Sequence, residues 1–427
     1  MLISTFLLSN NKLMRLLKIT LIAVGLLVLL KVVDVLLSKF SPLTIYFHQN
    51  LLKSLQLLLL VWLVLSLILP LIMKKRPQKA QQIATLSIIF LSLVFEILFG
   101  YWLQHPSRIP SFLLNAFRQY YTINYRKVIQ VESNCSEFDS QFFYKLRPSV
   151  QCNFSNIEFS TLIETNSVGL RDNENALIGP QVICLGDSYT MGWGVQQQES
   201  FPQRLARISG LKVLNAGMSS FGTVRELRKL QTLDTANCQW IVLQYCDNDV
   251  EETKPYVDNK FSLKTSSKPT YDSLVSRYEW NRVYYPGKTF LSVDNYLLKG
   301  LAKKFSKKDS LVEVGNLKLS VEETVKLFAE TLSSFNIPFE NRRLIILYVN
   351  TNDFPDRRFT NGLHRLLQTS PYMEKFENKI FYLNTSDLLN KGDQYILDDH
   401  YRPAAHDKIA NAIAKIISEH PLMPANP

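Results

Sequence analysis

Short apolar runs alternate with amphipathic stretches of helical period from residue 176 onward, and this alternation restricts the fold more than any other feature. Apolar runs of strand length, each followed by a helical stretch, are the pattern of an α/β domain with a parallel sheet. The predicted strands are residues 181–186, 211–215, 240–246, 342–349 and 379–384. The predicted helices are about residues 198–209, 223–234, 321–335, 360–368 and 403–418. Five strands, with a polar turn after the first, favour a three-layer, flavodoxin-like sheet.

The first predicted strand ends in the turn Gly186-Asp187-Ser188, which presents a serine hydroxyl at the carboxyl edge of the sheet. Ligands of open parallel sheets bind at this edge. A helix that begins at the serine would offer backbone N–H groups, which favour developing negative charge. Ser188 is therefore a candidate nucleophile, provided that a base reaches it. Asp187 is expected to cap the turn or the helix.

A candidate base lies far along the chain, in the segment Asp398-Asp399-His400. Asp398 and His400 are two residues apart, so one turn can present both. The carboxylate can then hold the imidazole in the tautomer that accepts the serine proton. His406 is a rival base, but its place at the start of the last predicted helix favours a packed or capping histidine. Asp399 is a rival carboxylate, but a directly adjacent side chain points away from His400 more readily.

Two further polar segments follow predicted strands between these ends. The first is Asn215-Ala216-Gly217-Met218-Ser219-Ser220-Phe221-Gly222, and the second is Asp247-Asn248-Asp249. Together with the segments of Ser188 and His400, they resemble the four sequence blocks of the SGNH hydrolase family, also called GDSL esterases. The resemblance lies in the order and spacing of the blocks and covers roughly residues 130–420.

The resemblance implies an SGNH hydrolase fold and a role for each block. Ser188 would be the nucleophile, His400 the base and Asp398 its partner. The oxyanion would be bound by the backbone N–H groups of Ser188 and Ser220 and by the side chain of Asn248. Ser220 stands where the family usually has glycine; its backbone N–H survives that change, but a positive φ angle would strain the turn.

The resemblance further implies a serine esterase that cleaves O-acyl or lipid esters through an acyl-enzyme on Ser188. Two other interpretations stay open: an O-acyltransferase that modifies cell-envelope polysaccharide, and a catalytically silent envelope binding protein. The expected partners are a membrane and an ester-bearing small molecule, lipid or glycan. No cofactor is expected, and the chain lacks the CxxC and HExxH motifs that would indicate a metal site.

The N-terminal 104 residues carry most of the positive charge and three long apolar segments. They hold ten Lys or Arg and two acidic residues, a formal charge of +8 out of +11. The basic excess therefore indicates membrane topology, and no nucleic acid partner is expected. The segments, residues 19–37, 55–73 and 83–103, are near the ~20 residues that span a bilayer. By the positive-inside rule, the N-terminus and the basic cluster 74–79 lie in the cytoplasm, and everything after Leu103 lies outside.

This topology describes an integral membrane protein with its catalytic domain outside the cytoplasm. By analogy with the family, that side is the periplasmic face of a bacterial inner membrane. The first apolar segment could instead be a signal peptide, but no small-x-small cleavage site follows it, so an uncleaved anchor is favoured. Glu96 lies in the third segment. An intramembrane acid can mark a functional site, but no cation is visible in the adjoining segments, which favours a helix–helix contact or a site near the interface.

The domain plan has a membrane domain over 1–103, a β-rich lead-in over 104–175, and the SGNH-like domain over 176–427. An insertion at about 251–319, rich in Lys, Ser and Tyr, interrupts the last of these. It either shapes a substrate site or forms an irregular solvated surface. Cys135 and Cys152 lie in the part expected outside the cytoplasm. A disulfide is permitted there, although the sequence does not determine the pairing.

Overall fold

The chain forms two compact units, which are described one at a time. The computed structural model describes residues 77–304, 312–314, 317–335, 337, 342–349, 356–369 and 379–421, with scattered positions between 18 and 68. The larger unit comprises Lys127–Asp272 and Lys307–Pro427. The smaller unit comprises Met1–Arg126 and Ser273–Ser306. The boundaries show that part of the predicted insertion groups with the N-terminal residues.

A five-stranded parallel sheet of order β11-β10-β7-β5-β6 is the framework of the larger unit. The strands are β5 (Val182–Leu185), β6 (Val213–Asn215), β7 (Trp240–Cys246), β10 (Arg343–Val349) and β11 (Ile380–Asn384). With β5 counted as the first strand, this order is the flavodoxin-like one. The predicted α/β fold, its strands and its sheet order are therefore confirmed.

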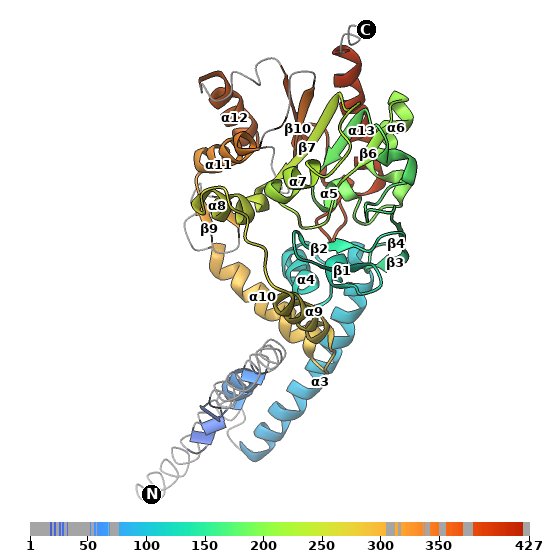
Figure 1. The fold of residues 1–427 in the computed structure, drawn as a ribbon. Coiled ribbons are helices and arrows are strands. Elements are labelled where there is room, and N and C mark those ends of the chain that lie inside the picture. The colour runs from blue at the N-terminus through green and yellow to red at the C-terminus, as the bar shows by residue number, and fades with distance from the viewer. Residues whose placement is uncertain are drawn as a thin grey trace, which may run out of the picture. The chain divides into compact units, whose positions relative to one another are not determined.

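Helices cover both faces of this sheet and complete three layers (Figure 1). On one face, α6 (Phe201–Ser209) and α13 (Pro403–Glu419) pack against alternate strand residues such as Val182 and Val242. On the other face, the Tyr245 ring stacks on Phe359 of α12 (Arg358–Thr369), with ring centroids 4.3 Å apart. Because both faces are covered, β5 and β7 are buried along their whole length, which explains why their residues are apolar except for Gln244.

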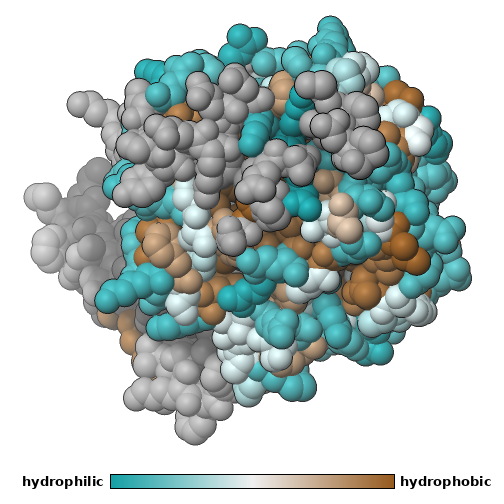
Figure 2. Space-filling model, turned by 45° about the horizontal axis from the view of Figure 1, so that its top comes forward, coloured by the Kyte–Doolittle hydropathy of each residue, from teal (hydrophilic) through white to brown (hydrophobic). Residues whose placement is uncertain are grey.

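Of the remaining helices of the larger unit, those at 223–230 and 321–334 match predicted helices, whereas the helix at 250–258 lies in the predicted insertion. These remaining helices include α5 (Ser188–Met191), α7 (Thr223–Leu230), α8 (Val250–Asp258) and α11 (Val321–Ser334). Ser320 and Glu323 form a capping box at the start of α11, because each side chain accepts from the backbone N–H of the other residue. On the face shown in Figure 2, hydrophilic residues dominate and hydrophobic residues form separate patches.

Two antiparallel hairpins precede the sheet. They are β1–β2 (Ser136–Asp139 and Phe143–Leu146) and β3–β4 (Gln151–Ser155 and Ser160–Glu164). A disulfide between Cys135 and Cys152, with Cα atoms 5.6 Å apart, joins the two hairpins. The first part of the predicted lead-in differs from the expectation, since residues 111–124 form a helix. The buried residues of that segment recur at helical rather than alternating spacing.

The smaller unit contains α3 (Pro77–Gln104), α4 (Ser111–Asn124), α10 (Lys288–Lys304) and most of α9 (Lys268–Arg282). Within α3, residues Thr85–Gln104 are long and apolar enough to cross a membrane, and only 11% of the most apolar window is buried. This helix coincides with the predicted segment 83–103. The predicted segment 19–37 lies largely outside the described residues. In segment 55–73 the described residues, among them 58–66, are helical, but among the described residues only Thr85–Gln104 is a candidate span, so the prediction of three spans is not supported.

The predicted insertion at 251–319 is mostly regular structure. It contains α8, α9, α10 and a short hairpin of β8 (Val312–Val314) and β9 (Leu317–Leu319). The sequence analysis left an irregular surface as one of two alternatives for the insertion, and the structure shows helices in these stretches instead.

Candidate active site

Ser188 stands at the first position of α5, directly after the carboxyl end of β5. Gly186 makes the turn possible, because its φ of +155° is rare for other residues and a Cβ there would lie 2.1 Å from Thr190 Oγ1. Asp187 is the N-cap of α5 and accepts from the Tyr189 backbone N–H at 2.9 Å. The local sequence thus sets Ser188 on a tight, buried turn whose hydroxyl faces the sheet edge.

The Ser188 hydroxyl meets the imidazole of His400, with Oγ and Nε2 separated by 2.7 Å. The other ring nitrogen, Nδ1, makes a short hydrogen bond to Asp398 Oδ1. The same carboxylate oxygen accepts from the His400 backbone N–H at 3.2 Å. In the neutral form of His400, Nδ1 therefore holds the proton that faces Asp398, and Nε2 can accept the serine proton. The structure thus joins Ser188, His400 and Asp398 in one continuous series of hydrogen bonds.

The two rival residues occupy different positions. Asp399 also reaches Nδ1 of His400, at 3.2 Å, but its side chain is 62% exposed whereas that of Asp398 is fully buried. His406 lies in α13 and accepts from the Phe201 backbone N–H at 3.2 Å. Burial, and then the charges of Arg204 and Arg171, lower the pKa of His406 to about 3. It is thus a neutral packing histidine that caps the start of α6.

The pKa of His400 is raised to about 9. Burial by itself would lower this pKa, but the charge and hydrogen bond of Asp398 outweigh burial, and Asp399 adds to the rise. Two aromatic rings enclose the imidazole: Trp193 stacks on it and Tyr189 lies on it at a tilt, each with ring centroids 4.8 Å away. At neutral pH the free protein therefore holds His400 largely as the imidazolium.

Two residues that the sequence analysis missed, Trp193 and Glu158, hold the Asp398–His400 segment in place. The Trp193 indole donates to Asp398 Oδ2 at 3.3 Å. Glu158, between β3 and β4, accepts from three successive backbone N–H groups, those of Ile396, Leu397 and Asp398, at 2.7–2.9 Å. A carboxylate with three such donors orients the whole turn that carries Asp398.

Arg171 holds the segment that carries Trp193. It is fully buried, and it donates to the carbonyl oxygens of Gly192, Val195 and Leu162. These contacts pin residues 192–195, and with them the Trp193 ring. Neither Arg171 nor Glu158 belongs to a recognisable sequence motif, because each acts through a fold contact with a distant segment.

The second half of the site is the loop after β6, which lies against the turn of Ser188. The Met218 backbone N–H donates to the Gly186 carbonyl at 2.9 Å. Position 217 must be glycine for the loop to lie this close to α5, because a Cβ there would lie 2.3 Å from the Met191 backbone nitrogen. Ser220 has a φ of +59°, the strained value that the sequence analysis considered. Among the described residues, its backbone N–H donates to no protein acceptor.

Side chains from other segments hold this loop. The Tyr144 hydroxyl donates to the Ser219 carbonyl, and Arg225 donates to the Ser220 carbonyl. Gln130 Nε2 donates to the Ser220 hydroxyl at 3.0 Å. The positive φ of Ser220 is thus stabilised by contacts on both sides of its peptide units.

Asn248 follows β7 and has an exposed side chain that makes no hydrogen bond within the described part of the chain. Its neighbour Asp249 is buried and accepts from the Thr223 hydroxyl at 2.8 Å, which joins the end of β7 to the start of α7. This contact agrees with a structural role for Asp249. The Asn248 amide and the N–H groups of Ser188 and Ser220 are therefore available donors at one edge of the sheet.

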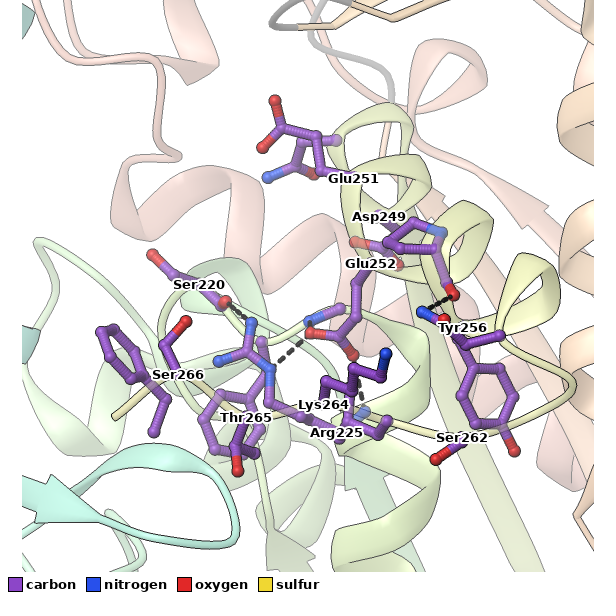
Figure 3. A pocket seen from close by; sticks show the side chains of 17 residues that line it. Ser220, Arg225, Asp249, Glu251, Glu252, Tyr256, Ser262, Lys264, Thr265 and Ser266 are labelled. Carbon is purple, nitrogen blue, oxygen red and sulfur yellow. Dashed lines mark hydrogen bonds and ion pairs between the residues drawn. The ribbon is translucent and has the colours of Figure 1, made fainter. Parts of the chain in front are cut away.

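A cavity of about 420 Å³ borders both Ser220 and Asn248. Its wall includes Arg225 and Glu252, which form an ion pair at one side (Figure 3). Hydroxyl and amide side chains share the lining with aromatic rings; they are Ser262, Thr265, Ser266, Asn259, Tyr256, Phe143 and Phe221. The cavity can accept a ligand that offers both hydroxyl groups and apolar faces.

One group of possible metal ligands occurs among the described residues, namely Asp398, Asp399 and His400. It shares Asp398 and His400 with the hydrogen-bonded series that begins at Ser188, and His400 Nδ1 already faces Asp398 there. The group therefore has a use that requires no ion.

Three solved structures illustrate what the chain is similar to. A protein described as lipolytic, of the G-D-S-L family from Desulfitobacterium hafniense DCB-2, shows 12% identity and a TM-score of 0.30, over 55% of this chain and 98% of that one. A carbohydrate esterase shows 12% identity and a TM-score of 0.31, over 57% and 69%. A carbohydrate esterase family 2 enzyme with a carbohydrate binding domain, from Corynascus thermopiles (Myceliophthora fergusii), shows 11% identity and a TM-score of 0.31, over 56% and 66%.

These neighbours are thus lipolytic proteins and carbohydrate esterases, but identities and TM-scores this low carry no argument about activity. No protein-family model matches the chain, and no curated protein matches it in sequence.

Proposed function

We propose that the protein is a membrane-anchored serine esterase that cleaves ester bonds outside the cytoplasm. The observation that carries the proposal is the chain from Ser188 Oγ through His400 to Asp398, with 2.7 Å between Oγ and Nε2. A serine, an imidazole and a buried carboxylate in this order form the apparatus of nucleophilic acyl transfer.

The proposed reaction begins when Ser188 Oγ attacks the ester carbonyl carbon and His400 Nε2 takes the serine proton. Asp398 keeps Nδ1 protonated and stabilises the imidazolium. The negative charge on the former carbonyl oxygen is bound by the N–H groups of Ser188 and Ser220 and by the Asn248 amide. The imidazolium then protonates the leaving alcohol, and the acyl group stays on Ser188. Water, deprotonated by His400, releases the acid and restores the serine.

The test is hydrolysis of a short-chain nitrophenyl ester by the full-length protein and by Ser188→Ala. We expect the variant to lose nearly all turnover and to lose labelling by a serine-directed phosphonate probe. Ser418→Ala, an exposed serine on α13, is the matched control and should retain both. Full activity in Ser188→Ala would refute the proposal.

Two observations support the proposed location. The α3 helix exposes large apolar side chains along its length, as a lipid-facing helix does; they include Leu86, Phe90, Leu93 and Ile97. The Cys135–Cys152 disulfide lies in the unit that carries Ser188, and disulfides persist in oxidising compartments. Protease treatment of intact and opened cells would test it, and digestion of the catalytic unit only after the cytoplasm is opened would contradict it.

The cavity beside Ser220 and Asn248 also supports a second candidate, an O-acyltransferase. Its hydroxyl, amide and aromatic lining suits a sugar, and a sugar hydroxyl could replace water as the acyl acceptor. Turnover of an acyl donor with and without oligosaccharides distinguishes the two. Acylated sugar in preference to free acid would assign the transferase, and free acid alone would assign the esterase.

A further inference from the structure

The turn between α9 and α10, in the smaller unit, is unusually apolar for a segment of an exposed insertion. The Lys288 backbone N–H donates to the Tyr285 carbonyl at 3.0 Å, and Gly287 has a φ of +83°. With Pro286 before the glycine, these are the features of a type II turn. The chain therefore reverses sharply at residues 285–288. Residues 280–290, which contain this turn and the adjoining helix ends, are called the hairpin below, and the turn is its tip.

Glu96 of α3 holds the start of α10. Its carboxylate accepts from the backbone N–H groups of Thr289 at 3.3 Å and Phe290 at 2.8 Å. These N–H groups belong to the first turn of a 17-residue helix, where an acidic partner is favourable. The Phe290 ring also stacks on Phe95 of α3, with centroids 5.3 Å apart. The expectation that Glu96 makes a helix–helix contact agrees with this arrangement.

The position of Glu96 along α3 sets the depth of the hairpin. Glu96 precedes Gln104, the end of the candidate span, by eight residues, which is about 12 Å along a helix. Half of the hydrocarbon core of a bilayer is about 15 Å thick. If α3 spans the membrane, the first turn of α10 and the preceding tip lie below the membrane surface.

The side chains of the tip suit that depth. Tyr284 is 63% exposed, and Trp280 and Val283 are also exposed. Residues 283–287 contain no charged side chain. The next cation, Lys288, is buried, and its Nζ donates to the carbonyl oxygens of Asn281 and Val283. Exposed apolar and aromatic side chains over a stretch without charge are suited to contact with lipid.

We infer that residues 283–287 are embedded in the outer leaflet of the membrane beside α3. The hairpin makes a second contact with the membrane without spanning the bilayer, and the partner of its exposed tip is lipid. Glu96 serves this contact, because an acid inside a span is stabilised when helix N–H groups neutralise it. The inference rests on the proposed span of α3, and it is independent of the esterase chemistry.

Spin-label accessibility in the full-length protein tests the inference. Nitroxide labels are placed at Tyr284→Cys and Val283→Cys in nanodiscs of phosphatidylcholine and phosphatidylglycerol. Ile97→Cys reports on the lipid-facing side of α3, and Ile178→Cys, an exposed apolar residue of the larger unit, reports on water. The native cysteines do not compete for the label, because Cys135 and Cys152 are paired and the others are buried.

We expect the labels at 284, 283 and 97 to collide several-fold more often with oxygen than with a water-soluble nickel chelate, and the label at 178 to show the reverse. Lipid contact at 97 combined with water contact at both 283 and 284 would overturn the hairpin inference and leave the span intact. Water contact at 97 would overturn the span and the hairpin together. The activity of Ser188 is measured separately, so neither result is confused with a failure of the esterase proposal.

Discussion

The two halves of the candidate active site are held in different ways. In the nucleophile half, Asp398 is fixed by the Trp193 indole and by its backbone bond to Glu158, and the imidazole of His400 lies between two aromatic rings. In the oxyanion half, Ser220 adopts a strained backbone angle, and the Asn248 side chain is exposed and unbonded within the described residues.

This difference indicates which half of the site has its catalytic groups oriented before substrate binds. Electrostatic stabilisation depends on donors that are already oriented before charge develops. The nucleophile half meets this condition in the free protein. The Asn248 amide does not, and it borders the cavity, so we expect a bound substrate to complete its orientation. Substitutions in the two halves should therefore affect catalysis differently.

The largest effect is expected for Asp398→Asn. An asparagine would favour the wrong imidazole tautomer, so kcat should fall by about 10⁴-fold with a nearly unchanged KM. Steady-state hydrolysis of a nitrophenyl ester measures this change. Asp399→Asn is the matched control, and its kcat should stay within about threefold of the original at pH values well above the pKa of His400. If Asp399→Asn proved the more damaging, Asp399 would be the functional partner of His400.

The oxyanion half is tested by Asn248→Ala. Loss of one oxyanion donor typically lowers kcat by about 10²–10³-fold. Asn259→Ala removes another amide of the same cavity, one that donates to the Pro255 carbonyl, and should alter KM more than kcat. Equal kcat for the original protein and Asn248→Ala would show that the backbone N–H groups suffice, and the contrast between the halves would disappear.

The pH dependence of kcat/KM sharpens the description of the nucleophile half. Because His400 must be neutral to accept a proton and its pKa is raised to about 9, kcat/KM should rise about tenfold per pH unit from pH 7 and level off near pH 9. Asp399→Asn removes one of the charges that raise this pKa, so its rise should occur at lower pH. A profile that is flat between pH 7 and 9 would contradict the protonated resting state.

The smallest effect is expected for Ser220→Gly. Glycine relieves backbone strain of about 1–3 kcal/mol. It also raises the conformational entropy of the unfolded chain and removes the hydrogen bond from Gln130, and both changes destabilise the folded state. The free energy of unfolding should therefore change by no more than about 1 kcal/mol. Ser220→Val, whose branched side chain disfavours positive φ, should lower the melting temperature clearly. Equal melting temperatures for both variants would show that the turn is not strained.

Much of the fold was predictable because its signals are local. The five strands are mainly apolar runs followed or ended by Gly, Asn or Asp, and the capping box at Ser320 and Glu323 is contained in four residues. The α4 helix and the α9–α10 hairpin were not predicted. Tyrosines and asparagines occupy positions on their buried sides, so the contrast between the two faces is weak in the sequence and is established by packing within the smaller unit.

The candidate site divides in the same way. Ser188, Asn248, Asp398 and His400 were predicted from short motifs at strand ends and turns, whose order resembles that of a known family. Glu158 and Arg171 were not identifiable, because their partners lie 238–240 and 9–24 residues away, and no local pattern relates them.

The sequence by itself determined the α/β class, the strand order and the identity of the residues that meet at the sheet edge, because apolar periodicity and turn chemistry act over a few neighbouring residues. Only the tertiary structure decided which of Asp398 and Asp399 is buried against His400, and that the start of α10 rests on Glu96. Burial and hydrogen-bond partners belong to segments that approach each other only after the chain has folded, so their effects on charge and geometry cannot be read from one stretch of residues.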